Sequence, residues 1–327
     1  MENQIQKFAY EIVNHTVTIW RCFSQADVAE IPKEIDGYPV TRIAPYAFSA
    51  HMNEKELNLK NYTSMEALPA LCGDRLTAIY IPDTVAQVGR YCFYNCSQLE
   101  LISFTDTLRD WGSGAFTGCH SIQRLELYLY GDGRSGLKDI LTELPELTVV
   151  DYYRVKEEKI EQARLIFPEF YEEGVENTPA RLINYTVHGS GMRFRNCFQQ
   201  RVFSFFEYDS KFEYAGFQED FPVVAALAEG RLRYPMELSE KAKLRYEQFV
   251  CEQKESFADY IVEKKDTESL NWLVQFINAQ EKISQEERAE LLGRMTQRAL
   301  EVGFSEAVGI LMDAGQGKKK KRKSFEL

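Results

Sequence analysis

The segment Leu76-Thr77-Ala78-Ile79-Tyr80-Ile81-Pro82 opens a unit that recurs along the chain with a constant period. Ile79, Ile102 and Leu125 occupy the same place in three successive units and are equally spaced. Every unit begins with an apolar–x–apolar pattern, which places alternate side chains on opposite faces of a β-strand. A fixed period of 23 residues, as between Ile79 and Ile102, indicates a solenoid. The repeated units of a solenoid bury their apolar faces only by stacking on their neighbours.

The repeats are expected to extend over residues 28–151. One period back from Ile79 leads to Leu57, so a further strand is expected there. Residues 1–27 come before the repeats, and apolar residues alternate within Tyr10–Trp20. This alternation predicts a hairpin that caps the exposed end of the solenoid.

Other positions recur with the same period. Phe48, Phe93 and Phe116 are expected to stack as an aromatic ladder along the solenoid axis. Gly89 and Gly112 are also one period apart, and glycine is the residue that tight turns most readily accept. We therefore expect each unit to turn sharply after its glycine.

The unit Leu76…Ile79-Tyr80-Ile81-Pro82…Val85…Val88-Gly89…Cys92-Phe93…Cys96 resembles the BspA-like leucine-rich repeats. The segment Asp36-Gly37-Tyr38-Pro39-Val40 is similar to the opening unit of such domains. The Leu57–Leu76 unit is degenerate, and Thr105 stands where the family has proline. The resemblance covers somewhat less than half of the chain and implies a bacterial-type protein with a curved parallel sheet used for protein contact.

The residues between the apolar strand positions are expected to face outward on that sheet. Repeat proteins commonly bind partners through their strand-lined surface, whereas a single outward residue is often merely solvated. The candidate protein-binding residues are Asn58, Tyr80, Ser103, Arg124, Glu126, Tyr128 and Thr148.

Residues 155–316 are predicted to form an α-helical domain. Apolar spacing predicts helices over Lys156–Tyr171 and Thr178–Val187. A helical array is then expected over Phe221–Gly230, Ser239–Lys265, Thr267–Ala279, Ser284–Gly303 and Ser305–Gly315. Ser284 and Glu287 form a capping-box pattern, and the segment from Ala299 to Gly315 is similar to a helix pair of an ankyrin-type repeat.

An aromatic-rich stretch lies near the start of this region, between Phe198 and Phe217. Aromatic residues at a spacing of three to four normally pack into a helix core. The alternative is an aromatic-lined pocket or partner groove, and the sequence alone does not separate the two.

The bulk composition limits the class of protein. The 327 residues carry a net charge of −11, which disfavours a general binder of nucleic acid or anionic membrane. No secretory signal and no apolar stretch of membrane-spanning length is visible in the sequence. We therefore expect a cytoplasmic location, no membrane association, and seven reduced cysteines.

A basic segment, residues 317–327, ends the sequence, and its low complexity predicts a disordered tail. It is a solubility tail, a docking arm with apolar anchors, or a nucleic-acid contact. The candidate docking residues are Lys318, Lys319, Lys320, Lys321, Arg322, Lys323, Phe325 and Leu327.

No motif in the sequence requires a reaction, a cofactor or a metal. His188-Gly189-Ser190-Gly191 is glycine-rich but lacks the strand–turn–helix setting of a nucleophile or phosphate loop. Cys92, Cys96, Cys119 and His120 nominally offer zinc ligands, although the repeat period alone explains Cys96 and Cys119.

The fold class expected is α+β. An N-terminal leucine-rich repeat solenoid with a parallel strand-lined sheet is followed by an all-α domain, for which an array of helical repeats is one alternative. The expected function is a non-enzymatic cytoplasmic scaffold or adaptor that binds an unidentified protein through the sheet face. One alternative is an enzyme with a site around His188–Tyr214 in the helical domain. Another is a nucleic-acid-associated protein that uses the basic tail.

Overall fold

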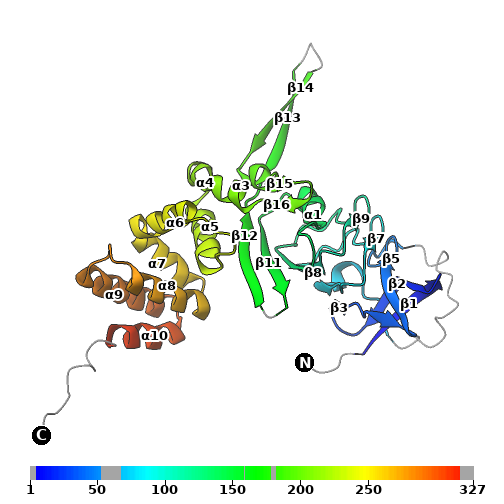
Figure 1. The fold of residues 1–327 in the computed structure, drawn as a ribbon, viewed down its shortest axis with the longest axis horizontal. Coiled ribbons are helices and arrows are strands. Elements are labelled where there is room, and N and C mark those ends of the chain that lie inside the picture. The colour runs from blue at the N-terminus through cyan, green and yellow to red at the C-terminus, as the bar shows by residue number, and fades with distance from the viewer. Residues whose placement is uncertain (1–4, 53–67, 158, 178–181, 317–327) are drawn as a thin grey trace, which may run out of the picture. The chain divides into compact units, whose positions relative to one another are not determined.

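The computed structural model describes residues 5–52, 68–157, 159–177 and 182–316 (Figure 1). The chain divides into two compact units, unit 1 (Met1–Glu219) and unit 2 (Asp220–Leu327). Unit 1 is a β-solenoid with short helices at its end, and unit 2 is helical throughout the part that the structure describes. The expected α+β class is therefore confirmed.

The elements of unit 1 follow in chain order. They are β1 (Gln6–Val13), β2 (Thr16–Ser24), β3 (Val28–Glu30), β4 (Glu34–Ile35), β5 (Tyr38–Ile43), β6 (Ala78–Tyr80), β7 (Gln87–Val88), β8 (Leu101–Thr105), β9 (Asp110–Trp111), β10 (Arg124–Leu129), α1 (Leu137–Glu143), β11 (Thr148–Lys156), β12 (Lys159–Phe167), β13 (Tyr171–Asn177), β14 (Leu182–His188), α2 (Gly191–Arg195), β15 (Phe198–Gln199), β16 (Val202–Phe203), α3 (Phe205–Ser210) and α4 (Phe212–Gln218).

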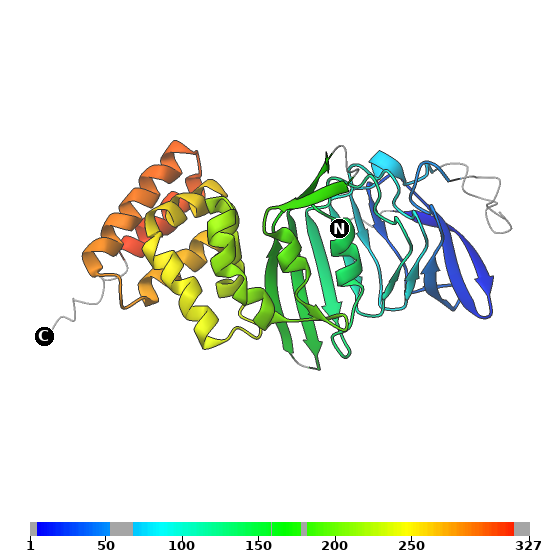
Figure 2. The same ribbon diagram turned by 90° about the horizontal axis from the view of Figure 1, so that it is seen from above.

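Two sheets run along the solenoid, and successive coils contribute neighbouring strands to each (Figure 2). One sheet has the order β1-β2-β5-β7-β9, with β4 paired to β5, and the other has the order β12-β11-β10-β8-β6-β3. The coil strands pair in parallel, as stacked repeats require. The antiparallel hairpin β1–β2 starts the solenoid, which confirms the hairpin predicted within residues 1–27.

The repeat expected at Leu57 does not add a strand to the long sheet. β3 pairs directly with β6, and Phe48 stacks on Phe93 with 5.5 Å between ring centroids. Phe93 in turn stacks on Phe116 at 5.5 Å, so the predicted aromatic ladder is confirmed. Leu57 itself lies outside the described residues.

The coils approach one another closely at the repeated glycines. A Cβ atom on Gly89 would lie 2.4 Å from the backbone nitrogen of Pro45, and one on Gly112 would lie 2.2 Å from that of Arg90. Neither glycine has a positive φ angle. These positions therefore require glycine because the preceding coil packs against their backbone, rather than for the tight turns expected from the sequence.

The repeated cysteines form a second internal ladder. The Cys96 thiol donates to the Phe48 carbonyl at 3.2 Å, and the Cys119 thiol donates to the Phe93 carbonyl at 3.0 Å. Burial raises the pKa of the Cys119 thiol to about 12. These thiols are thus neutral, small buried groups that join consecutive coils.

The helix predicted over Lys156–Tyr171 is wrong, because this range contains the whole of strand β12. Ala163, Leu165 and Phe167 are buried at every second position, and β12 pairs antiparallel with β11 along its length. An unpaired β11 would expose a row of backbone donors and acceptors, and β12 satisfies them. The predicted domain start at residue 155 consequently falls at the β11–β12 turn, while unit 1 continues to Glu219.

The helix predicted over Thr178–Val187 is also wrong. Residues Leu182–His188 form β14, which pairs antiparallel with β13 from Tyr171↔His188 to Asn177↔Leu182. Tyrosine and the β-branched residues isoleucine, threonine and valine favour a strand once a partner strand is available.

The aromatic-rich stretch closes the solenoid. Phe198, Phe203, Phe205, Tyr208 and Phe212 are buried, which confirms the core interpretation for these five. Their rings pack on inward side chains of β11 and β12: Tyr152 lies 5.4 Å from Phe205, and Phe167 lies 5.8 Å from Tyr208. The Tyr208 hydroxyl also bonds both the N–H and the carbonyl of Ile166, each at 2.7 Å, so it protects the outer edge of β12.

Unit 2 contains six helices among the described residues. They are α5 (Phe221–Arg233), α6 (Glu240–Glu252), α7 (Lys254–Glu263), α8 (Thr267–Ala279), α9 (Gln285–Glu301) and α10 (Ser305–Gln316). The helix predicted over Ser239–Lys265 is divided at Gln253. The capping box of Ser284 and Glu287 is confirmed, and α9 and α10 form an adjacent helix pair, although their ankyrin resemblance stays a prediction. Within the described ranges, no helix has the length and apolar character needed to cross a membrane.

Candidate functional site

The strand register brings one outward residue from each strand of the long sheet into a continuous row. The row runs through Glu30, Tyr80, Ser103, Glu126, Asp151 and Arg164. A flanking row runs through Thr105, Tyr128, Tyr153 and Gln162. We call these two rows, with Arg124, the sheet face. It contains five of the seven residues predicted from the sequence.

One predicted residue, Thr148, does not belong to the sheet face. Thr148 is fully buried, and its hydroxyl donates to the Glu146 carbonyl at 3.0 Å. In the strand register, Glu126 of β10 lies opposite Asp151 of β11. Asp151 comes more than one period after Glu126 because the connection that contains α1 lengthens this repeat. The Thr148 prediction is therefore wrong, and Asp151 takes its place. Asn58 lies outside the described residues.

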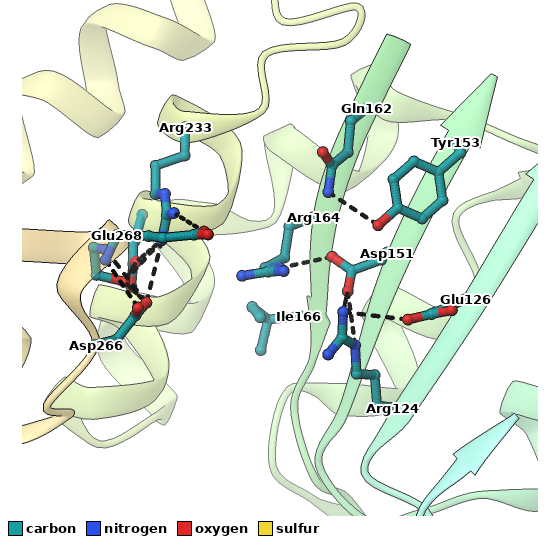
Figure 3. A network of polar contacts seen from close by, with 12 residues as sticks. Arg124, Glu126, Asp151, Tyr153, Gln162, Arg164, Ile166, Arg233, Asp266 and Glu268 are labelled. Atoms are coloured by element: carbon teal, nitrogen blue, oxygen red, sulfur yellow. Dashed lines mark hydrogen bonds and ion pairs between the residues drawn. The ribbon is translucent and has the colours of Figure 1, made fainter. Parts of the chain in front are cut away.

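A charged network fixes one end of the sheet face (Figure 3). The Asp151 carboxylate is fully buried and accepts from Arg124 Nη2 at 2.7 Å and from Arg164 Nε at 2.7 Å. Arg124 Nη2 also lies 3.3 Å from Glu126 Oε1. Asp151 lies on β11, between Arg124 on β10 and Arg164 on β12. Because one buried carboxylate binds both guanidinium groups, the three side chains are held in one geometry.

A tyrosine stack lies beside this network. The rings of Tyr128 and Tyr153 are parallel within 13° and 4.7 Å apart, and Gln162 Nε2 donates to the Tyr153 hydroxyl at 3.4 Å. Burial and the nearby Asp151 carboxylate raise the pKa of Tyr153 to about 12, and burial likewise raises the pKa of Tyr128. Both phenols therefore stay neutral at physiological pH and present an apolar ring with a polar hydroxyl.

Two further tyrosines extend the aromatic surface at its margin. Tyr80 is 39% exposed, and Tyr130, directly after β10, is 57% exposed. Their phenols lie close enough to influence the ionisation of Tyr128. Sequence reasoning missed Tyr130, although the tyrosines at positions 128 and 130 share one side of a strand by alternation. The sheet face is thus aromatic, ordered and nearly balanced in charge.

The comparison with known families settles the nature of the coils. Residues 21–129 match the family model described as BspA type leucine rich repeat region, in six copies. Residues 21–129 of this chain are therefore a BspA-type leucine-rich repeat region. The resemblance inferred from the sequence is confirmed for these residues.

Solved structures of leucine-rich repeat proteins are similar to this region. One from Bacteroides ovatus is 22% identical with a TM-score of 0.28, and the match covers 39% of this chain and 31% of that one. One from Bacteroides capillosus is 22% identical with a TM-score of 0.27, and the match covers 40% of this chain and all of that one. A leucine-rich cell surface protein from Faecalibacterium prausnitzii is 19% identical with a TM-score of 0.25, covering 39% and 37%. No curated protein matches the chain.

The zinc arrangement considered for the leucine-rich repeats has no support in their geometry. The thiols of Cys96 and Cys119 donate to carbonyl groups, and Cys92 is fully buried. His120 points to solvent and lies 3.0 Å from a Glu146 carboxylate oxygen. Among the described residues, no three potential ligands are grouped to hold a metal ion.

The glycine-rich segment around Ser190 also lacks the geometry of a nucleophile. The Ser190 side chain is fully buried, whereas His188 stacks on Tyr171 at 4.6 Å and lies 3.1 Å from Glu173 Oε2. His188 is the last residue of β14, and both of these contacts are with β13 of the same hairpin. A nucleophile must instead be open to its substrate and lie within hydrogen-bond reach of its base.

Unit 2 has a polar network that sequence reasoning missed (Figure 3). Arg233 on α5 donates to Glu229 at 3.0 Å and to the Ser269 hydroxyl of α8 at 2.7 Å, and Lys264 lies 2.6 Å from Glu229. Burial acts to raise the pKa of Asp266, but hydrogen bonds from Ser269 and the Glu268 N–H lower it overall. These groups satisfy one another and connect helices, so their role is structural.

Proposed function

We propose that the chain is a protein-binding adaptor that uses the sheet face of its leucine-rich repeats. The leucine-rich repeat fold is that of a protein-interaction module, built to present an extended strand-lined surface. The observation that carries the proposal is the stacked pair Tyr128–Tyr153 beside the buried Arg124–Asp151–Arg164 network.

The physical argument concerns the entropy of binding. A partner gains most from aromatic side chains that bury a large area and lose little freedom on contact. Tyr128 and Tyr153 are already held by mutual stacking, and their neighbours are fixed by ion pairs across three strands. The surface is therefore preorganised, which reduces the ordering cost that weakens most interfaces.

The cysteines support a reducing location for this adaptor. All seven are free, and burial raises the pKa of Cys22, Cys119 and Cys197 to about 12. Thiols in such surroundings are poor nucleophiles and remain reduced in a cytoplasm. The cytoplasmic assignment is part of the proposal.

The test compares two sets of aromatic substitutions in the full chain. The first set changes Tyr80, Tyr128 and Tyr153 to alanine. The control set changes Phe206 and Phe217 to alanine, since these exposed rings of α3 and α4 lie outside the sheet face. A partner captured by the native chain from a bacterial lysate is purified, and its affinity for each variant is measured by calorimetry.

The sheet-face set should weaken binding by about 100-fold or more, because central aromatic residues contribute on the order of 2 kcal/mol each. The control set should change affinity less than threefold or so. Equal affinity of all three proteins contradicts the proposal. Circular dichroism of each variant shows that a loss of binding does not reflect unfolding.

A further inference from the structure

The β13–β14 hairpin is an incomplete sheet. It projects from the rest of unit 1 (Figure 1), and β13 and β14 make their main contacts with each other. Where its side chains are described they are largely exposed, as Tyr171, Tyr185 and Val187 illustrate at 56%, 67% and 43%. An isolated two-stranded ribbon is marginally stable in water, and a third strand is the usual remedy.

The two strands differ in how well they protect their outer edges. β13, with the sequence Tyr-Glu-Glu-Gly-Val-Glu-Asn, has three glutamates and a glycine in its short length. Charge and glycine make a poor pairing edge. β14, with the sequence Leu-Ile-Asn-Tyr-Thr-Val-His, has no acidic residue, lysine or arginine and is rich in strand-forming residues. Within the described ranges, β14 pairs with no strand other than β13.

The sequence of β14 is nearly symmetric in polarity about Tyr185. An antiparallel copy centred there would place Ile183 opposite Val187 and the two polar residues that flank Tyr185 opposite each other. Tyr185 would face Tyr185 of the second copy. Residues of similar polarity meet at each of these positions. The edge of β14 is therefore complementary to itself, as a two-fold interface requires. An antiparallel pairing of two β13 strands, centred on Gly174, would place Glu172 opposite Glu176. Like charges in that arrangement repel.

We infer that the chain self-associates through β14, with a second copy adding its own β14 in antiparallel register about Tyr185. The result is a four-stranded sheet in the order β13-β14-β14-β13. Main-chain hydrogen bonds supply the affinity, and the Tyr185 pair lies on the two-fold axis. A pair of chains carries two sheet faces, so a multivalent partner would bind it with increased avidity.

The direct measurement is sedimentation velocity of the full chain over a wide micromolar concentration range. The weight-average mass should rise from 37.9 kDa toward twice that value. Each copy has a net charge of −11, so added salt should strengthen the association by screening the repulsion. A chain that stays monomeric overturns the inference and leaves the β14 edge to a strand of another protein. Association that weakens with salt also contradicts it.

Substitution at the axis identifies the interface. Tyr185→Lys should weaken association by about tenfold, since it replaces an aromatic pair by two opposed cations. Mixing Tyr185→Lys with Tyr185→Glu should restore it, because only a residue that faces its own copy is rescued by opposite charges. Tyr171→Lys, on β13 of the same hairpin, is the matched control and should leave association unchanged. Failure of the mixture to associate, or loss in the control alone, overturns the assignment.

Discussion

Unit 1 and unit 2 hold their arginines in different ways. In unit 1, the buried Arg21 donates to the carbonyls of Ala47 and Ser49, and the buried Arg195 donates to carbonyls at the end of α1 and at Pro168. In unit 2, the arginines that join helices bind carboxylates, as Arg294 binds Asp259 and Arg298 binds Glu263. A solenoid fixes its backbone positions and can use carbonyl groups as ligands along its length. Packed helices offer free carbonyls mainly where they end, as after α5, where the buried Arg231 donates to the carbonyls of Tyr234 and Met236.

The difference explains why the sheet face stands out within unit 1. There, Arg124 and Arg164 bind the buried carboxylate of Asp151 instead of backbone oxygens. Backbone contacts and the internal cysteine ladder hold the coils together elsewhere in unit 1. We therefore expect unit 1 to be intolerant of backbone changes and unit 2 to be tolerant, and three experiments measure this contrast.

The largest effect is expected where two coils touch. Gly112→Ala adds a Cβ atom 2.2 Å from the Arg90 backbone nitrogen, so the coils must separate. We expect a loss of at least about 4 kcal/mol in the free energy of unfolding of unit 1. Hydrogen exchange read by mass spectrometry reports unit 1 and unit 2 separately.

The matched control is Gly309→Ala in α10, where the new Cβ meets open space. Alanine favours a helix interior, so this change should stabilise unit 2 by about 0.5–1 kcal/mol. If Gly112→Ala is as harmless as Gly309→Ala, the close packing of coils is wrong.

An intermediate effect is expected at Arg195. Its guanidinium lies within 3.0 Å of the carbonyl oxygens of Leu141, Leu144, Glu146 and Pro168. Arg195→Met would leave these oxygens without a donor, and we expect a loss on the order of 3 kcal/mol. Chemical denaturation monitored by the same exchange method measures it.

Arg294→Met is the comparison in unit 2. This arginine is about half exposed and pairs with Asp259 at 2.6 Å. Exposed ion pairs contribute little to stability, so this change should cost clearly less than Arg195→Met. Equal losses for the two variants would show that unit 1 does not depend on its carbonyl-bound arginine.

The smallest effect is expected from alkaline pH. A buried thiol of unit 1 such as Cys119, with its pKa raised to about 12, keeps its proton in the fold but loses it in the unfolded chain above about pH 9. The unfolded state then binds fewer protons, so stability falls as pH rises from about 9 toward 12. Cys119→Ala should reduce the fall between pH 9 and 10 by about 1 kcal/mol.

Cys251→Ala in unit 2 provides the control for this pH dependence. Cys251 is only partly buried, and its removal should leave the alkaline slope of unit 1 unchanged. An identical slope for native and Cys119→Ala chains would mean that the thiol ladder ionises freely, contrary to the packing described.

The repeats were predictable from the sequence because each position occurs several times. Three occurrences of one pattern at Ile79, Ile102 and Leu125 fix the register of three strands. The prediction failed where the spacing changes, at the connection that contains α1. Local sequence does not show how many residues a connection between two repeats contains. Thr148 was therefore predicted at the register position opposite Glu126 that Asp151 occupies.

The region between residues 156 and 188 was misjudged for another reason. Ile160, Ala163, Leu165 and Phe167 fit a helical and an alternating pattern in part, and their pairing partners lie elsewhere in the chain. Long-range strand pairing decided the outcome. For the same reason Tyr153, Gln162 and Arg164 entered the sheet face only through the structure, whereas Tyr80, Glu126 and Tyr128 were identified from the period alone.

Hydroxyl-radical footprinting tests the central claim most directly, since it reads side-chain accessibility in the native chain. The oxidation rates of Tyr80, Tyr128 and Tyr130 would be compared with and without the captured partner, with the exposed Phe206 and Phe217 as internal references. Binding at the sheet face predicts that the three tyrosines become protected by about fivefold or more while the two phenylalanines do not change. Unchanged tyrosine oxidation at a saturating concentration of partner would contradict the claim.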